Sequence, residues 1–146
     1  FVYDGIAAAG RFDWVLGDIR ANYGPMLASG TTTLWESFSP QGSLCHGFSA
    51  TPVYQLSRHC LGVVAEAPGY ARFSVAPEMG DLDWARGTIP TGHGPIHVEW
   101  KVRENQLEVE LLYPSTCEMI IPDRPGRRLA SRDVIPFGAA LVFDLL

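Results

Sequence analysis

The sequence predicts an α+β chain in two parts, with helices over residues 1–65 and an antiparallel β-sandwich over residues 66–146. In the first part, apolar residues recur at helical spacing. In the second part, apolar and polar residues alternate over short segments. Proline and glycine punctuate those segments, as expected of the turns in a sandwich. The break between the two patterns places the boundary at residue 65.

The first predicted helix carries one apolar stripe. Its members follow the spacing i, i+3, i+4, i+7 and i+11, and they are Phe12, Val15, Leu16, Ile19 and Tyr23. Proline has no backbone N–H and disfavours the α conformation in the residue before it. The sequence therefore predicts that this helix ends at Gly24 and Pro25.

A second helix is predicted over residues 44–61. Either Thr51 caps it, with Pro52 at the first helical position, or it begins at Ser43 and bends at Pro52. Its apolar face is formed by Val53, Leu56, Cys60 and Val63, and Gly62 suits its C-terminal end. The intervening residues 29–37 are too polar and too rich in β-branched side chains to predict a helix.

The strongest local signal is a β-hairpin. Residues 96–102 and 107–113 both alternate apolar with polar side chains, and Glu104 and Asn105 form the turn between them. Further short strands are predicted over residues 72–75, 83–87, 118–121 and 140–145.

Composition narrows the function classes. The chain has 146 residues, 47% of them hydrophobic, and a net charge of −5. It has no basic stripe for nucleic acid and no run of 18 apolar residues for a membrane. It begins at Phe1 without a leader pattern, which is typical of an excised piece. Its three cysteines lie far apart and predict buried free thiols.

Charge is divided unequally between the two parts. Residues 1–65 hold four of the 16 acidic residues and three of the 11 basic residues. Short helices with so few charges are expected to bury their surface against something else.

Glu36 is the carboxylate that stands out, because it follows Trp35 in a polar, threonine-rich segment. An aromatic ring beside a carboxylate suits a sugar site, where the ring stacks on the sugar and the carboxylate moves a proton. From composition alone, a structural tryptophan with a surface or capping glutamate is the favoured interpretation. His46 either bonds a sugar hydroxyl or is satisfied by nearby backbone.

The sequence shows no pattern for a metal site, a nucleophilic serine or a phosphate-binding loop. His93 and His97 have zinc-binding spacing for a helix, but Gly92, Gly94 and Pro95 exclude a helix there, so no metal is expected. The sequence contains no nucleophile elbow and no phosphate-binding glycine loop, and no cofactor is expected. Arg124, Arg127 and Arg128 are interpreted as part of a solvated turn.

Ordered blocks of residues resemble the C-terminal part of bacterial α-L-rhamnosidases, family 78 of the glycoside hydrolases. The blocks are TTTLWE at 31–36, SLCHGF at 43–48, PVYQLSR at 52–58, LGV at 61–63, PGY at 68–70, VAP at 75–77, GDL at 80–82, ARG at 85–87 and the segment 90–94 before the strand at 96–100. The resemblance covers nearly the whole chain and weakens after about residue 114.

The resemblance implies a fold and an activity. Residues 1–65 would be the last helices of an incomplete (α/α)6 catalytic toroid, and residues 66–146 the C-terminal β-sandwich domain. These enzymes remove terminal α-L-rhamnose from glycosides or polysaccharides with inversion, which needs two carboxyl groups flanking the sugar. Glu36 matches the family's general base, and Trp35 and His46 match positions that line the sugar pocket.

The general acid of the family lies upstream of the matched part and has no counterpart here. The resemblance therefore implies a fragment of an inverting glycosidase that carries the base and is inactive alone. The helical face is expected to be covered by self-association or by an upstream catalytic segment. The alternative is a non-catalytic β-sandwich module that binds carbohydrate or protein, with Trp84 or Trp100 as exposed aromatic candidates. Trp100 shares the apolar face of its strand and is expected in the core.

Overall fold

The computed structural model describes every residue, Phe1–Leu146, and the chain divides into two compact units, Phe1–Leu56 and Ser57–Leu146. The division falls before residue 65 because residues 57–65 are bonded to the sheets. The indole Nε1–H of Trp100 donates to the Cys60 carbonyl at 2.8 Å, and the Ala76 N–H donates to the Gly62 carbonyl at 2.8 Å. The assignment of residues 1–65 to an incomplete toroid stays a prediction.

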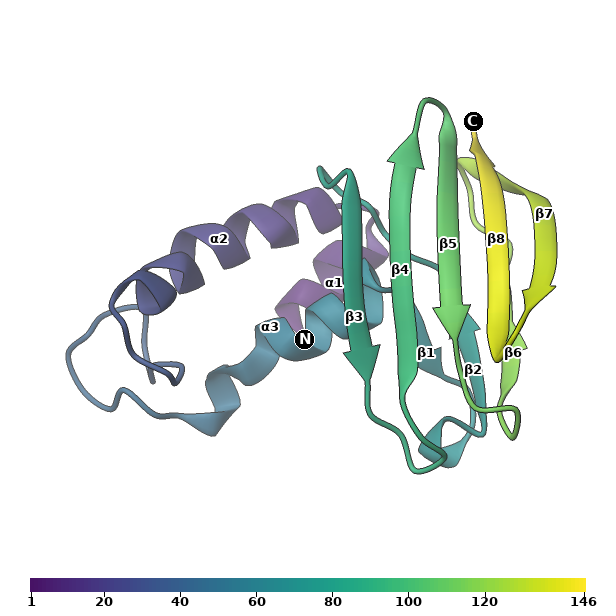
Figure 1. Cartoon of the computed structure of the whole chain (residues 1–146). Helices are drawn as coiled ribbons and strands as arrows, with labels where there is room; N and C mark the ends of the chain where they lie inside the picture. The colour runs from purple at the N-terminus through teal and green to yellow at the C-terminus, as the bar shows by residue number, and fades with distance from the viewer. The chain divides into compact units, whose positions relative to one another are not determined.

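The first unit is built on two packed helices, α1 (Val2–Ala8) and α2 (Phe12–Ala28) (Figure 1). The apolar stripe buries Phe12, Val15 and Leu16 of α2, as its spacing predicts. Helix α1 was not predicted. Ala7 is its only buried residue, so α1 carries no apolar stripe for periodicity to detect.

The predicted end of α2 at Gly24 and Pro25 is wrong, because the helix continues through Pro25 to Ala28. Proline removes one hydrogen bond, but Met26 directly after it is 1% exposed, so the last turn is held by packing. The Ser29 hydroxyl then donates to the Met26 carbonyl at 2.6 Å, and Gly30 leaves the helix at φ +78°.

The single helix predicted over residues 44–61 is three short pieces. They are the 3₁₀ turn η1 (Gly47–Ala50), α3 (Thr51–Gln55) and a π-helical turn, η2 (Leu56–Cys60). Pro52 does lie in the first turn of α3, but Thr51 makes no capping hydrogen bond. The predicted apolar face is only partly buried, because Val53 is 64% exposed whereas Cys60 and Val63 are buried.

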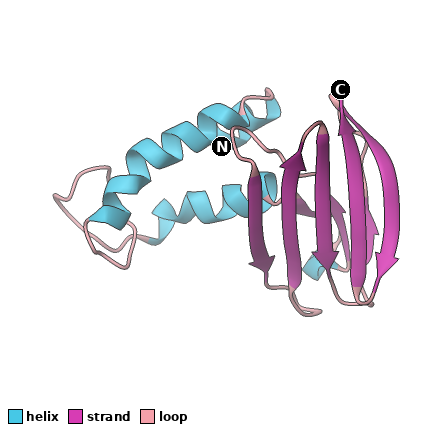
Figure 2. Cartoon of the chain, turned by 45° about the horizontal axis from the view of Figure 1, so that its top comes forward, coloured by secondary structure: helices cyan, strands magenta, loops and turns pink.

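The second unit is a β-sandwich. Its five-stranded sheet has the order β3 (Trp84–Ile89), β4 (Ile96–Arg103), β5 (Gln106–Leu112), β8 (Gly138–Leu145), β7 (Arg127–Ile135), all antiparallel. Its three-stranded sheet has the order β1 (Val63–Ala65), β2 (Arg72–Val75), β6 (Glu118–Ile120), and a short 3₁₀ turn, η3 (Pro68–Tyr70), joins β1 to β2. Figures 1 and 2 show the small sheet behind the large one.

The two sheets bury the alternating side chains that the sequence singled out. From β4 these are Ile96, Val98 and Trp100, whereas β2 shows no alternation and buries the consecutive residues Phe73, Ser74 and Val75. The hairpin turn at Glu104 and Asn105 is confirmed. One pairing departs from an antiparallel arrangement, since β2 and β6 run parallel.

Strand β7 was missed, and its arginines were placed in a turn. Arg127 and Arg128 instead begin this nine-residue edge strand. None of its residues is buried, so it has no hydrophobic alternation and is held by backbone pairing to β8. A bulge between Leu129 and Ser131 interrupts that pairing.

The three cysteines are free. Cys60 and Cys117 are buried as predicted, whereas Cys45 is exposed, which corrects that part of the prediction. Burial raises the pKa of the Cys60 thiol to about 11, so this thiol stays protonated at neutral pH. No helix in the chain has the length and apolar character needed to cross a membrane.

Gly62→Ala should destabilise the sheet unit by about 2 kcal/mol or more. Gly62 has φ +72°, and a Cβ there would lie 2.1 Å from the Pro77 backbone nitrogen. Urea unfolding followed by tryptophan fluorescence measures the change. Gly92→Ala is the matched control, since nothing lies within 4 Å of its Cβ position, and it should change the free energy of unfolding by less than about 0.5 kcal/mol. Equal effects from the two variants would contradict this account.

Candidate functional site

The segment that carries Trp35, Glu36 and His46 is an irregular loop between α2 and η1. Two backbone hydrogen bonds hold its two arms together. The Glu36 N–H donates to the Ser43 carbonyl at 2.9 Å, and the His46 N–H donates to the Leu34 carbonyl at 2.9 Å. This ladder sets Glu36 and His46 side by side although they are ten positions apart.

Trp35 anchors this loop. Its side chain is 5% exposed, and its indole Nε1–H donates to the Thr31 hydroxyl oxygen at 3.0 Å. Its carbonyl accepts a hydrogen bond from the buried Ser49 hydroxyl at 2.6 Å, and its N–H faces the Met26 sulfur at 3.5 Å. The ring is therefore packed inside the helical unit, and the residue that follows it is held at the surface.

Glu36 and His46 form a loose pair. Glu36 Oε2 and His46 Nδ1 lie 3.9 Å apart, and the two side chains are 49% and 34% exposed. The distance is too long for a hydrogen bond, so the buried Nδ1 atom of His46 has no hydrogen-bond partner. Gly42 lies beside the carboxylate at φ +106°, a conformation that L side chains rarely adopt. An exposed carboxylate beside an imidazole can accept a proton from a water or a sugar hydroxyl.

Phe48 supplies an exposed aromatic ring at this pair. Its ring centroid lies 4.4 Å from that of His46, the planes are tilted by 57°, and the side chain is 68% exposed. Sequence reasoning did not select Phe48 as a site residue. Its position two residues after His46 was the available signal, and only the turn at η1 brings the two rings together.

The other three carboxylates of Phe1–Leu56 are already engaged. Asp4 accepts a hydrogen bond from the Gln55 side-chain amide at 3.2 Å, Asp13 pairs with Arg11 at 3.0 Å, and Asp18 accepts hydrogen bonds from Tyr3 and Asn22. The hydrogen bond from Arg11 lowers the pKa of Asp13, which is opposite to what a general acid at neutral pH needs. Glu36 is thus the carboxylate of this unit that makes no hydrogen bond with its side chain and only the 3.9 Å approach to His46.

The two histidines with zinc spacing are bonded separately. His97 Nδ1 lies 2.8 Å from the Thr88 hydroxyl, and His93 Nδ1 lies 3.4 Å from the Thr116 hydroxyl. No group of three or more histidine, cysteine, aspartate or glutamate side chains in the chain is arranged to hold a metal ion.

A match to a protein-family profile identifies the family of this chain. The profile described as the bacterial alpha-L-rhamnosidase C-terminal domain matches residues 62–135, which cover β1 to β7. The chain belongs to this family. The resemblance seen in the ordered sequence blocks is confirmed, and the sandwich is the rhamnosidase C-terminal domain.

Named relatives agree with this assignment. An α-L-rhamnosidase of Alteromonas sp. (strain LOR) is 32% identical over 98 residues, which cover 59% of this chain and 11% of that protein. An α-L-rhamnosidase of Streptomyces avermitilis is 29% identical over 125 residues, covering 73% of this chain and 12% of that protein. The chain therefore spans about one eighth or less of the curated relatives it matches.

Similarity to solved structures covers more of the chain than the family profile and includes residues of the helical unit. A family 78 rhamnosidase of Bacillus sp. GL1 superposes with a TM-score of 0.73 at 35% identity, covering 82% of this chain and 14% of that one. The α-L-rhamnosidase of Dictyoglomus thermophilum, at 19% identity and a TM-score of 0.62, covers 84% of this chain and 17% of its own and shows a shared fold.

Thr31→Val should destabilise the helical unit of this rhamnosidase-family chain by about 1–3 kcal/mol. The substitution keeps the side-chain shape but leaves the buried Trp35 Nε1–H without its acceptor. Thermal unfolding followed by near-ultraviolet circular dichroism measures the loss. Thr32→Val is the matched control, because Thr32 is exposed, and it should leave the transition nearly unchanged. A Thr31→Val protein as stable as the control would rule out an anchoring role for this hydrogen bond.

Proposed function

We propose that this chain is the C-terminal part of an α-L-rhamnosidase-like glycoside hydrolase that removes terminal α-L-rhamnose with inversion. In this proposal, residues 1–65 complete the end of an (α/α)6 catalytic domain. Family membership supports the substrate class. The observation that carries the site is the exposed Glu36 carboxylate beside His46.

Glu36 is proposed as the general base. In an inverting glycosidase the base takes a proton from the water that attacks the anomeric carbon, while an acid on the opposite side protonates the leaving oxygen. Glu36 suits the base role because its carboxylate is exposed and makes no ion pair shorter than the 3.9 Å approach to His46.

His46 and Trp35 are proposed to line the sugar pocket. The Nδ1 atom of His46 lacks a hydrogen-bond partner, so a sugar hydroxyl or a small shift of Glu36 can satisfy it. Trp35, whose ring is packed beneath the loop, is proposed to form the floor of that pocket.

The general acid is proposed to come from an upstream catalytic segment. The other carboxylates of the helical unit are engaged in bonds of their own, and none is a free partner for Glu36. Losing general-acid catalysis costs about 10²–10⁴-fold in rate, and losing the substrate-orienting walls costs more. The chain alone is therefore proposed to be inactive.

Glu36→Gln should abolish turnover in an assembled enzyme. The assembly is a chimera in which this chain replaces the segment it matches in the Bacillus sp. GL1 rhamnosidase. Release of aryl alcohol from an aryl α-L-rhamnoside should fall by about 10²-fold or more, because glutamine cannot accept the proton. Nuclear magnetic resonance of the first-formed sugar anomer reports inversion.

Glu118→Gln in the same chimera is the control, since Glu118 is an exposed residue of β6 and should leave turnover unchanged. Full activity of the Glu36→Gln chimera would reject Glu36 as the base. Turnover by the isolated chain, lost on Glu36→Gln, would reject the proposal that the chain is inactive alone.

The helical unit is proposed to use its exposed apolar side chains as a contact surface. Leu27 is 75% exposed and Val53 is 64% exposed, and Phe48 and Tyr54 are also exposed. Large apolar side chains gathered on one small unit are typical of a surface covered by another chain or segment. In the complete enzyme the occupant is the upstream catalytic segment, and in the isolated chain it is a second copy.

The isolated chain should therefore self-associate as its concentration rises. Size-exclusion chromatography with light scattering should report a mass above the monomer's 16.0 kDa. Leu27→Ser combined with Val53→Ser should shift the equilibrium to monomer, whereas Val134→Ser, at an 87% exposed position of β7, should not. A monomer at all concentrations would refute this contact surface.

A further inference from the structure

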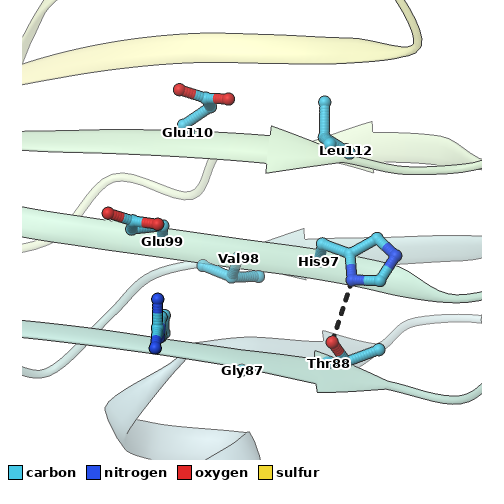
Figure 3. A pocket seen from close by; sticks show the side chains of 8 residues that line it. Gly87, Thr88, His97, Val98, Glu99, Glu110 and Leu112 are labelled. Atoms are coloured by element: carbon cyan, nitrogen blue, oxygen red, sulfur yellow. Dashed lines mark hydrogen bonds between the residues drawn. The ribbon is translucent and has the colours of Figure 1, made fainter.

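A hollow of about 390 Å³ lies on the large sheet, over strands β3, β4 and β5. Figure 3 shows the side chains that line it, which come from neighbouring strands. Side chains at every second position of a strand share one face. Arg86, His97, Glu99 and Glu110 are exposed and alternate with core residues, so the hollow opens on the outer face of the five-stranded sheet.

Three charged side chains form one row across this hollow. Arg86 is the register partner of Glu99 on the adjacent strand, and Glu99 is the partner of Glu110 on the next. Partners in antiparallel strands have Cβ atoms about 5 Å apart, and like charges placed opposite each other destabilise a sheet. Figure 3 shows the Glu99 and Glu110 carboxylates side by side above their strands. The sheet thus carries an electrostatic cost at this position.

The neighbouring row shows how such charges are normally satisfied. Glu108 pairs with Lys101 at 3.4 Å and with Arg103 at 3.3 Å. Arg86, Glu99 and Glu110 make no hydrogen bond or ion pair with one another, so their donor and acceptor atoms remain available to a ligand. The unpaired row is therefore a set of hydrogen-bonding groups on a rigid support.

An exposed indole lies on the same face. Trp84 precedes Arg86 by two positions on β3, so the two side chains point to one side of the sheet, and Trp84 is 60% exposed. Within the hollow itself, Thr88 holds the His97 ring by a 2.8 Å hydrogen bond, and Leu112 adds an apolar edge. A flat ring beside a row of carboxylate and guanidinium groups suits a pyranose, because its apolar face can stack on the ring while the hydroxyls around its edge bond to the charged groups.

We propose that this hollow, together with the Trp84 ring that lies outside its lining on the same face of β3, binds a neutral oligosaccharide, with the sugar face stacked on Trp84 and its hydroxyls bonded to Arg86, Glu99 and Glu110. Carboxylates and guanidinium groups form strong, charge-assisted hydrogen bonds with vicinal hydroxyls. The row holds one positive and two negative side chains, a formal charge of −1, so it disfavours uronic acids and sulfated sugars. This binding site does not depend on Glu36 acting in hydrolysis.

Isothermal titration calorimetry of the 146-residue chain tests the site. The neutral probes are a rhamnosyl-rhamnose disaccharide, xylotriose and cellotriose, and the acidic probe is trigalacturonate. At least one neutral probe should bind saturably, and trigalacturonate should bind more weakly. Trp84→Ala should raise the Kd of the bound probe about fivefold or more, and Glu110→Gln about tenfold.

Matched variants separate recognition from folding. Trp84→Phe keeps an aromatic ring and should retain most of the affinity, whereas Trp14→Ala removes an exposed indole of the helical unit and should have no effect. Glu118→Gln removes an exposed carboxylate from the small sheet and should likewise leave the Kd unchanged. Far-ultraviolet circular dichroism confirms that each variant is folded.

Three outcomes overturn the proposal. They are no saturable binding of any neutral probe, binding that neither Trp84→Ala nor Glu110→Gln weakens, and tighter binding of trigalacturonate than of every neutral probe. Because none of these measurements involves turnover, failure here leaves the proposed base role of Glu36 standing, and failure of that role leaves this site standing.

Discussion

The sandwich depends on how residues 60–62 are clamped between its two sheets. The buried indole of Trp100 on β4 donates to the Cys60 carbonyl at 2.8 Å. The next side chain, Leu61, occupies the space that a Cβ on Gly87 of β3 would need, 2.6 Å from its Cδ1. Gly62 then lies against the Pro77 backbone in a conformation that L side chains rarely adopt. Three consecutive residues thus tie the entry of the small sheet to the large one, and they explain why residues 57–65 belong to the sheet unit.

The loop at Glu36 is likewise held by a hydrogen bond from a buried tryptophan indole. A buried tryptophan, here Trp35, satisfies its indole N–H on a hydroxyl of the same loop and so fixes the backbone of its exposed neighbour. The ladder between residues 34–36 and 43–46 then brings His46 to Glu36 without a regular strand. The backbone of Glu36 is fixed in this way, while its carboxylate stays at the surface beside His46.

Charged side chains on the outer face of the large sheet are arranged in two different ways. Where Glu108 meets Lys101 and Arg103, opposite charges close into ion pairs, and such exposed pairs contribute little to stability. Where Glu99 meets Glu110, like charges face each other with Arg86 left open. Facing glutamates are not needed for solubility, because separating Glu99 from Glu110 would relieve their repulsion and keep both charges at the surface. The proposed binding of an uncharged, hydroxyl-rich ligand accounts for the facing glutamates.

The amino-acid sequence by itself determined the two-part α+β architecture, the stripe of α2, the hairpin of β4 and β5, and the core position of Trp100, because each follows from a local period. It also determined the family, through the order of its blocks, which the profile over residues 62–135 confirms. Only the tertiary structure decided that α2 runs through Pro25, that β7 is a strand, and that Phe48 lies against His46. The helix continues because Met26 is packed, β7 forms because its backbone pairs with β8, and Phe48 meets His46 because of a single 3₁₀ turn. None of these causes produces a repeating side-chain pattern, so none can be recognised in the sequence.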